Sequence, residues 1–368
     1  MKIAILTNFS HPSICGVWSR VKQEGELLAN FHEVRVFSSN SIKGTKKRSG
    51  KEETIGKLKI KRFNSIKLGG ESFLYWRFGK ELIKFKPNVI IAHSYRQLHT
   101  TKALRLANKL KCKVFLVTHA PFVEGNITRT VLAKIVVRLY DRFIGHRTLN
   151  KFDKIIAITK WELPYLLNIG ADKNKISYIP NGLDDKFFTY KKTKEQEKIF
   201  FLGRVAPIKD IETLILAFSL LKNKNIKLEI VGSYEEDYLR KLKNLINEKN
   251  IKNITFKEPI YNLDDKIKKI DSAKIFVLPS IREGMPQSLI EAMAREKIVI
   301  ASDNTGSKEI IEDGKNGYLF KIGDYKDLAR KIEIGLKNNK NLGKEAKKSV
   351  EKFSWGIIIK KTLELIES

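Results

Sequence analysis

Residues 274–302 constrain the fold of this chain more than any other stretch of its sequence. The stretch opens with the apolar run Ile275–Leu278, which Pro279 ends, and this pattern predicts a buried strand. After a short polar turn, residues 288–295 predict a helix and Ile298–Ser302 predicts a second buried strand. A strand, a helix and a strand in this order favour a parallel α/β sheet. Such sheets bind ligands at the carboxyl ends of their strands.

Two carboxylates stand out in this stretch: Glu283 in the turn and Glu291 in the helix, with seven residues between them. The amides at a helix N-terminus attract phosphate, whereas two neighbouring acids repel it. We therefore expect the acids to accept hydrogen bonds from sugar hydroxyls. A nucleotide-sugar combines a diphosphate with hydroxyl-bearing rings and fits this pattern. An ordinary helix start with solvated acids is the alternative.

With its flanks, this stretch resembles the E-x7-E segment of the family-4 retaining glycosyltransferases, although that family usually has Phe where Met285 stands. The resemblance extends over most of the chain. It implies an α/β fold of two Rossmann-like domains that face each other across a cleft, the GT-B fold. It also implies that Glu283 contacts the donor sugar as a catalytic residue and that Glu291 contacts the ribose.

A length of 368 residues suggests two domains. Pro180 and Gly182 interrupt the strand pattern, and the polar residues 190–198 read as a linker. The predicted domains are an N-terminal, acceptor-side domain at 1–180 and a nucleotide-sugar-binding domain at 181–352. A final helix at 353–368 follows, and in the resembling family this helix returns to the first domain.

The net charge of +30 is unevenly distributed, because residues 1–180 contribute +22 and residues 181–368 contribute +8. The positive electrostatic potential that this charge creates attracts phosphate-rich partners. No apolar run is long enough to span a membrane. Cys15 and Cys112 lack metal spacing, so we expect reduced thiols in the cytoplasm.

Residues 128–149 alternate apolar and basic side chains at helical spacing. A basic amphipathic helix can lie at a membrane interface, and we assign Arg138 and Arg142 to this side. The alternative is a helix that packs one face on its own domain. The first reading predicts a peripheral protein at the cytoplasmic face of the inner membrane, in contact with an anionic surface.

Four residues are candidates in the first domain. Gly16 lies between a strand and a helix, where backbone can approach the donor phosphates. The family usually has two glycines here, whereas this chain has Cys15 before Gly16. Trp18 and Lys22 lie where an acceptor would bind, although Trp18 fits a core position equally well. His119 ends a parallel strand, and the family uses a histidine there against the donor sugar.

In the second domain, Arg204 and Lys209 follow a strand near glycine, where the two cations would hold a diphosphate. They match the G-R-x-x-x-x-K segment of the family, with Asp210 in place of the usual glycine. Further donor contacts are expected around the predicted helix start and along two strand ends. The phosphate contacts are Met285, Pro286, Gln287 and Ser288, and the nucleoside contacts are Gly232, Pro259 and Ile260.

The sequence contains no D-x-D tripeptide, no H-E-x-x-H and no paired cysteines, so neither a metal nor another cofactor is expected. Cations and helix amides would then stabilise the departing nucleoside diphosphate.

The predicted function is transfer of a sugar, with retention, from a nucleotide-sugar to a glycan or lipid-linked acceptor. A nucleotide-sugar epimerase or hydrolase on the same scaffold is the alternative. A non-catalytic polyanion binder is a third reading, and basic motifs interleaved with aromatics, typical of nucleic-acid binding, are missing.

Overall fold

The computed structural model describes residues 1–13, 15–69, 73–122, 131–189, 191, 193–337 and 340–367; for Leu132 and Lys340 only the backbone is described. The chain forms two compact units. The first unit comprises Met1–Gly182 together with Gly356–Ser368, and the second comprises Leu183–Trp355. The boundaries expected from sequence, after residues 180 and 352, lie two and three residues before the structural ones.

The first unit is built on an eight-stranded sheet in the order β10-β9-β8-β7-β1-β2-β4-β3. Its strands run parallel except β3, which pairs antiparallel with β4 at the edge. The central strands β1, β7, β8 and β9 are nearly continuous buried apolar runs because helices cover both faces of the sheet, whereas β3, β4 and β10 are partly exposed. Their bounds are β1 Lys2–Thr7, β2 Glu33–Ser39, β3 Glu52–Ile55, β4 Leu58–Phe63, β7 Val89–His93, β8 Lys113–Val117, β9 Lys154–Ala157 and β10 Ile176–Tyr178.

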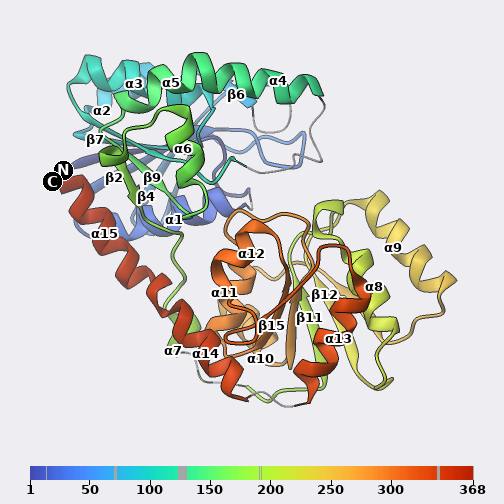
Figure 1. The fold of residues 1–368 in the computed structure, drawn as a ribbon. Helices are drawn as coiled ribbons and strands as arrows, with labels where there is room; N and C mark the ends of the chain where they lie inside the picture. The colour runs from blue at the N-terminus through green and yellow to red at the C-terminus, as the bar shows by residue number, and fades with distance from the viewer. Residues whose placement is uncertain are drawn as a thin grey trace. The chain divides into compact units, whose positions relative to one another are not determined.

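In Figure 1, α2, α3 and α5 lie on one side of the first sheet, and α1 and α15 lie on the other. A separate antiparallel pair, β5 (Ser65–Gly69) and β6 (Phe73–Trp76), also belongs to this unit. The helices are α1 Gly16–Leu28, α2 Gly79–Phe85, α3 Leu98–Leu110, α4 Val131–Tyr140, α5 His146–Thr148, α6 Leu163–Ile169 and α15 Trp355–Glu367.

The second unit has a six-stranded parallel sheet in the order β13-β12-β11-β14-β15-β16. The chain starts at β11, adds β12 and β13 on one side, and then returns to add β14, β15 and β16 on the other. The strands are β11 Lys198–Leu202, β12 Lys227–Val231, β13 Ile254–Lys257, β14 Ile275–Leu278, β15 Ile298–Ser302 and β16 Tyr318–Phe320. This is the doubly wound order of a Rossmann fold, with a topological switch point between β11 and β14.

Helices cover both faces of the second sheet, with α8 and α13 on one side and α11 and α12 on the other (Figure 1). The predicted strand, helix and strand of residues 274–302 are confirmed as β14, α11 and β15. The helices are α7 Lys186–Thr189, α8 Ile211–Ser219, α9 Glu236–Glu248, α10 Leu263–Asp271, α11 Gln287–Ala294, α12 Thr305–Ile310, α13 Tyr325–Leu336 and α14 Lys340–Val350.

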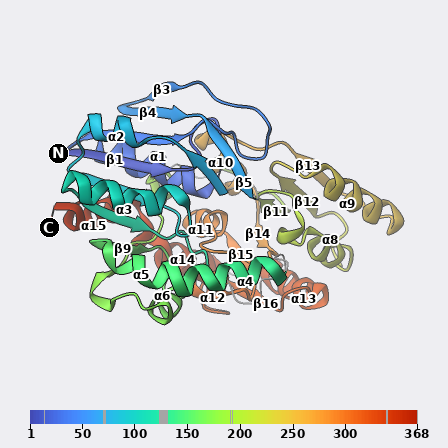
Figure 2. The same ribbon diagram turned by 90° about the horizontal axis from the view of Figure 1, so that it is seen from above.

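The amphipathic segment predicted at residues 128–149 forms a continuous helical run from Val131, although residues 128–130 lie outside the described part of the chain. The run begins as α4, widens into a π-helix at Asp141–Gly145 and continues through α5. Its α4 end extends beyond α2 and α3 in both views of the ribbon (Figures 1 and 2). Within the described residues, no helix combines the length and the apolarity that crossing a bilayer requires.

Candidate functional site

The second unit places the predicted cations and one predicted acid at its topological switch point. Arg204 and Lys209 lie in the loop that follows β11, and Glu283 lies in the loop that follows β14. These two strands are adjacent and parallel, so both loops leave the same edge of the sheet. Open α/β sheets bind ligands at this position because the chain diverges there in two directions.

Lys209 and Glu283 are in direct contact across this edge. The Nζ atom of Lys209 donates a hydrogen bond to Oε1 of Glu283 at 2.5 Å, and both side chains are largely buried. The backbone also joins the two loops, because the amide of Ile281 donates to the carbonyl oxygen of Ile208 at 3.0 Å. Arg204 lies farther out in the β11 loop, where its guanidinium is 3.4 Å from Glu235 and is half exposed.

Asp210 explains how this loop forms without the glycine that the resembling segment usually has. Its backbone has φ of +47°, in the left-handed region that glycine accommodates most readily. Aspartate tolerates this region better than most side chains, because its short polar group can bond locally. Here its Oδ2 accepts a hydrogen bond of 2.7 Å from the hydroxyl of Thr213. Asp210 therefore adopts the left-handed backbone conformation that a glycine would also accept at this position.

The turn before α11 presents backbone amides at the same edge. Pro286 is the N-cap residue and makes no side-chain cap, so the amides of Gln287 and Ser288 have no capping acceptor. Met285 and Gln287 are half-buried beside them. Eight residues is long enough for α11 to attract an anion at its N-terminus. The predicted phosphate contacts thus lie together at the start of one helix.

Glu291 lies in the second turn of α11 and is 7% exposed. Its Oε1 accepts a hydrogen bond from Nζ of Lys266 in α10, and its Oε2 has no hydrogen-bond partner. Buried polar side-chain atoms without partners recur around this helix. They are Ser280 Oγ, Gln287 Nε2, Glu291 Oε2 and Ser307 Oγ. Such atoms are uncommon in folded proteins, and their concentration here is typical of a ligand site.

Two glycines of the second unit are packed against the loops that carry the charged groups. A Cβ on Gly306, in the first turn of α12, would lie 2.6 Å from the carbonyl oxygens of Glu283 and Gly284. A Cβ on Gly232 would lie 1.9 Å from the carbonyl oxygen of Gly203. The position of a Cβ on Gly232 is thus taken by the loop that precedes Arg204, and the predicted contact of Gly232 with the nucleoside stays a prediction. Pro259 and Ile260 follow β13 at the sheet edge and are half-buried.

In the first unit, Gly16 is exposed at the start of α1, where a Cβ would meet nothing within 4 Å. Cys15 is the N-cap residue and makes no side-chain cap, so the first amides of this helix have no capping acceptor either. Trp18 is 5% exposed, and Lys22 is half-buried. The burial of Trp18 fits the core position that the sequence left open, and its role toward an acceptor stays a prediction.

His119 follows β8 and is half-buried. Its Nε2 lies 2.9 Å from Nδ1 of His93, which ends the adjacent strand β7. Burial, together with the charge of Arg20, lowers the pKa of His119 to about 3. Beside it, Thr118 donates a hydrogen bond of 2.6 Å to Glu162, whose pKa burial raises to about 7. The imidazole of His119 is therefore neutral near pH 7 and is held at the carboxyl edge of the first sheet.

Arg138 and Arg142 are exposed on the helical run that begins with α4. Asp141 holds this run to its unit by accepting hydrogen bonds of 3.1 Å from the hydroxyl of Tyr95 and 2.9 Å from Nε of Arg96. Several apolar side chains of the run nevertheless face solvent. Their exposed fractions are 73% for Val131, 48% for Ile135, 57% for Val136, 49% for Leu139, 53% for Phe143 and 41% for Ile144. The sequence alternative of a helix with its apolar face packed on its own domain accounts for only part of this surface.

Several residues at these positions were not foreseen from the sequence. Lys266 contacts Glu291 from α10, and its lysine-rich surroundings gave no sign of this role. Nothing in the local sequence pattern around Gly306 indicates that this glycine packs against the Glu283 loop. His93 ends β7, and no sequence pattern indicates that Glu24 of α1 lies 3.5 Å from it.

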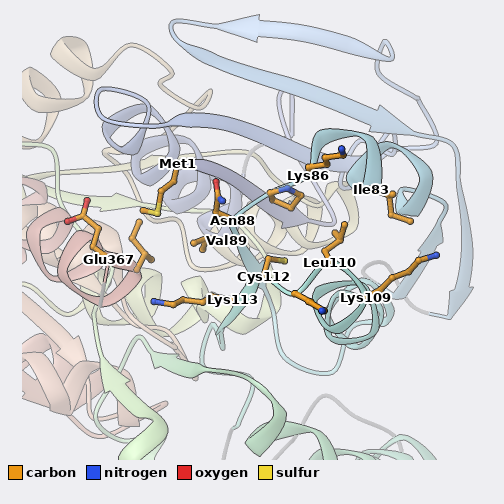
Figure 3. A pocket seen from close by; sticks show the side chains of 13 residues that line it. Met1, Ile83, Lys86, Asn88, Val89, Lys109, Leu110, Cys112, Lys113 and Glu367 are labelled. Atoms are coloured by element: carbon orange, nitrogen blue, oxygen red, sulfur yellow. The ribbon is translucent and has the colours of Figure 1, made fainter.

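A cavity of about 630 Å³ lies at the opposite edge of the first sheet, where β1, β7 and β8 begin (Figure 3). Met1, Asn88 and Lys113 mark the starts of those strands, and Glu367 of α15 closes one side. Parallel sheets bind ligands at the other edge, so this cavity is separate from the candidate site. Among the described residues, no group of three or more His, Cys, Asp or Glu side chains is arranged to hold a metal ion.

Two family models match the chain. The model described as Glycosyltransferase Family 4 matches residues 15–187, and the model described as Glycosyl transferases group 1 matches residues 184–352. The first therefore covers most of the first unit, and the second covers nearly all of the second unit.

Curated relatives match the chain over part of their length. The capsular polysaccharide biosynthesis glycosyltransferase CapM of Staphylococcus aureus is 32% identical over 51% of this chain and 54% of its own. The N,N'-diacetylbacillosaminyl-diphospho-undecaprenol alpha-1,3-N-acetylgalactosaminyltransferase of Campylobacter jejuni is 26% identical over 58% of this chain and 60% of its own. The chain thus spans little more than half the length of these curated relatives.

Among solved structures, Anabaena Alr3699/HepE in complex with UDP and glucose has a TM-score of 0.76 and 16% sequence identity to this chain. The superposition covers all of this chain and 99% of the other. Identity this low shows the fold alone. The predicted GT-B fold, with two α/β domains built on parallel sheets, is confirmed.

Proposed function

The chain belongs to the family-4 glycosyltransferases, and we propose that it transfers a sugar from a nucleotide-sugar donor to a glycan or lipid-linked acceptor. Two family models that together extend over residues 15–352 support this proposal. The HepE structure of the same fold holds UDP and glucose, which supports a nucleotide-sugar as the donor.

The contact between Lys209 and Glu283 at the switch point is the observation that carries the proposal. A largely buried ammonium, two uncapped helix amides and a carboxylate are held within one sheet edge. A diphosphate suits the cation and the amides, because both attract negative charge. A sugar suits the carboxylate, because its hydroxyls donate hydrogen bonds. The donor would therefore replace the ion pair by two separate interactions.

We assign the departing nucleoside diphosphate to Lys209, Arg204 and the amides of Gln287 and Ser288. Fixed cations and amides lower the barrier when they face the oxygens on which charge develops. Glu283 would hold the hydroxyls of the transferred sugar, and Glu291 would hold those of the ribose. We propose that transfer proceeds with retention of anomeric configuration and without a metal.

We further propose that the α4 run lies on an anionic membrane that carries the acceptor. Val131, Ile135, Leu139 and Phe143 follow one another at four-residue spacing, as do Lys134, Arg138 and Arg142. Residues four apart share one face of a helix, so an apolar row lies beside a basic row. Exposed helices with this pattern bury their apolar side chains among acyl chains and leave their cations at the headgroups. A lipid-linked acceptor would then be met at the membrane surface.

The double variant Arg138→Gln with Arg142→Gln should bind vesicles of anionic phospholipid about 30-fold more weakly than the wild type. Each basic side chain near an anionic surface contributes about 1 kcal/mol, and two such losses correspond to this factor. Vesicle flotation at several salt concentrations measures the effect.

The control variant is Lys109→Gln with Lys111→Gln, which removes the same charge beside the cavity at the far edge of the first sheet (Figure 3). An equal loss of binding in both variants would show that net charge alone attracts the membrane. Ile135→Ser with Leu139→Ser should also weaken binding while leaving the melting temperature close to wild type, since both side chains are exposed.

Gly16→Ala should leave the melting temperature unchanged and weaken nucleotide-sugar binding by about tenfold or more. A methyl group there meets no protein atom within 4 Å, so any effect on binding arises from the ligand. The expectation rests on close approach of the donor phosphates to the start of α1. Thermal shift with and without donor separates stability from binding, and unaltered donor affinity would remove Gly16 from the site.

The donor can be identified by a thermal-shift panel of UDP, GDP and ADP with their common sugar derivatives. A ligand that binds the native state raises the melting temperature by mass action. At a ligand concentration of a hundred times Kd, it adds about 2.7 kcal/mol to the free energy of unfolding. The stabilising nucleotide-sugar is then incubated with a polyprenyl-diphosphate-linked glycan, and NMR of the product reports the anomeric configuration. Sugar conversion or release without any acceptor product would favour the epimerase or hydrolase alternative.

A further inference from the structure

A chain of buried polar side chains leads from the interior of the first unit to His119. Arg20 donates to the carbonyl oxygens of Ile179 and Pro180 at 3.0 and 2.9 Å, and to Oε1 of Glu24 at 3.3 Å. The other oxygen of Glu24, Oε2, lies 3.5 Å from Nε2 of His93. Arg20, Glu24 and His93 are each at most 2% exposed.

Glu24 Oε2 and His93 Nε2 face each other at 3.5 Å, and neither atom has a hydrogen-bond partner among the described residues. A buried donor or acceptor without a partner is costly, so a shared proton is the arrangement that satisfies both atoms. Burial lowers the pKa of His93 well below its usual range, and its ring therefore carries a single proton. That proton belongs on Nε2, because an unprotonated Nε2 would place its lone pair against a carboxylate.

This assignment determines the tautomer of His119. With the proton of His93 on Nε2, its Nδ1 is an acceptor, and it lies 2.9 Å from Nε2 of His119. His119 must then carry its own proton on Nε2 and donate it to His93. Its remaining nitrogen, Nδ1, keeps a lone pair and has no hydrogen-bond partner among the described residues. His99 supports this arrangement by holding the His93 carbonyl oxygen with its Nε2 at 2.9 Å.

The backbone at this edge is also strained. Four residues other than glycine have positive φ where β7 and β8 end: Ser94 at +77°, Arg96 at +67°, His119 at +61° and Ala120 at +48°. Such conformations cost on the order of 1–3 kcal/mol each and persist where the surroundings fix them, most often at functional sites. A network that served packing alone would not require strain at the residue it ends on.

We propose that Glu24 and His93 are positioning residues that hold His119 in the Nε2-protonated tautomer, so that Nδ1 accepts a hydrogen bond from a hydroxyl of the donor sugar. This inference rests on the proposed function for the identity of the ligand. The tautomer itself can be measured without any ligand. Arg20 orients the carboxyl group of Glu24 through its hydrogen bond to Oε1. The two imidazoles then transmit that orientation to the carboxyl edge of the first sheet.

The first test is the tautomer of His119 in the ligand-free wild-type protein. The chain has six histidines, and selective 15N labelling of histidine with two-bond proton–nitrogen correlation distinguishes a protonated ring nitrogen from an unprotonated one. The signals of His119 and His93 are assigned from the spectrum of His119→Gln. Both rings are expected to be protonated on Nε2 near pH 7. A His119 ring protonated on Nδ1 overturns the proposal.

Glu24→Gln should reverse both tautomers. The glutamine oxygen will face the Arg20 guanidinium, so its NH2 group faces His93 and can only donate. His93 then carries its proton on Nδ1 and donates to Nε2 of His119, which leaves Nδ1 of His119 protonated. Thr362→Val is the matched control, since it removes a hydroxyl 3.5 Å from the other oxygen of Glu24 and should leave both tautomers unchanged. Unchanged rings in Glu24→Gln would also overturn the proposal.

The second test uses the nucleotide-sugar selected by the thermal-shift panel. Glu24→Gln should lower kcat/KM for the donor about tenfold, as expected for one hydrogen bond lost to the sugar. In a His119→Ala background, the same substitution should have no further effect, because the pair acts through one imidazole. Additive losses would assign Glu24 a purely structural role. If NMR shows the predicted tautomers but the enzyme turns over no donor, the proposed function is contradicted and the tautomer assignment still holds.

Discussion

Lys209→Ala should slow sugar transfer by about 10²–10³-fold, the effect of removing one preorganised group that stabilises charge in a transition state. Lys209 is the largely buried cation at the switch point of the second sheet, and Glu283 is its partner at 2.5 Å. Its removal takes away charge from the departing diphosphate and leaves Glu283 without its cation. Steady-state kcat/KM with the identified donor measures the loss.

Lys241→Ala is a suitable control for this variant, because Lys241 forms an ion pair of similar length, 2.9 Å to Glu212, with its own side chain 70% exposed. Exposed pairs contribute little, so both activity and stability should stay near wild type. A Lys209→Ala enzyme within tenfold of wild type would contradict the assignment of the diphosphate to this lysine.

Gly306→Ala should reduce transfer about a hundredfold, although Gly306 is not itself a proposed ligand contact. The added Cβ would lie 2.6 Å from two backbone carbonyl oxygens, those of Glu283 and Gly284, so the loop must move. A displacement of about 1 Å at a catalytic group can cost a factor of 10² in rate, and overpacking costs typically 1–3 kcal/mol of stability. Rate and melting temperature should therefore both fall.

Gly50→Ala provides the comparison, since a Cβ at Gly50 meets nothing within 4 Å and its φ is unexceptional. Its rate and melting temperature should match wild type. The role assigned to Gly306 is refuted if Gly306→Ala transfers sugar at the wild-type rate, because the Glu283 loop would then tolerate displacement.

The sequence predicted secondary structure well wherever the pattern that determines it lies within one short segment. The run Ile275–Leu278, the stop at Pro279 and the helix after it follow from apolar patterning and backbone restriction, and each is found in the structure. The strand-end positions of Arg204, Glu283 and His119 follow for the same reason. A parallel sheet then brings such strand ends to one edge without any further information.

Other features depended on contacts between distant segments and could not be predicted in this way. The pairing of Lys266 with Glu291 and the packing of Gly306 on the Glu283 loop depend on how helices pack beside the sheet. The apolar row of α4 is a different case, because a row facing a core and a row facing solvent have the same periodicity. Only the exposed fractions of Ile135 and Leu139 separate the two readings.

The return of α15 to the first unit has a consequence for how this protein is made. The second unit, Leu183–Trp355, is inserted within the first, whose last segment is Gly356–Ser368. At about 5–20 residues per second, a ribosome needs roughly 10–35 s to synthesise the insertion. Throughout that interval the nascent first unit lacks α15, including Thr362, which is completely buried. The domain that begins synthesis first is therefore completed last, and chaperones would have their longest access to the face that α15 covers.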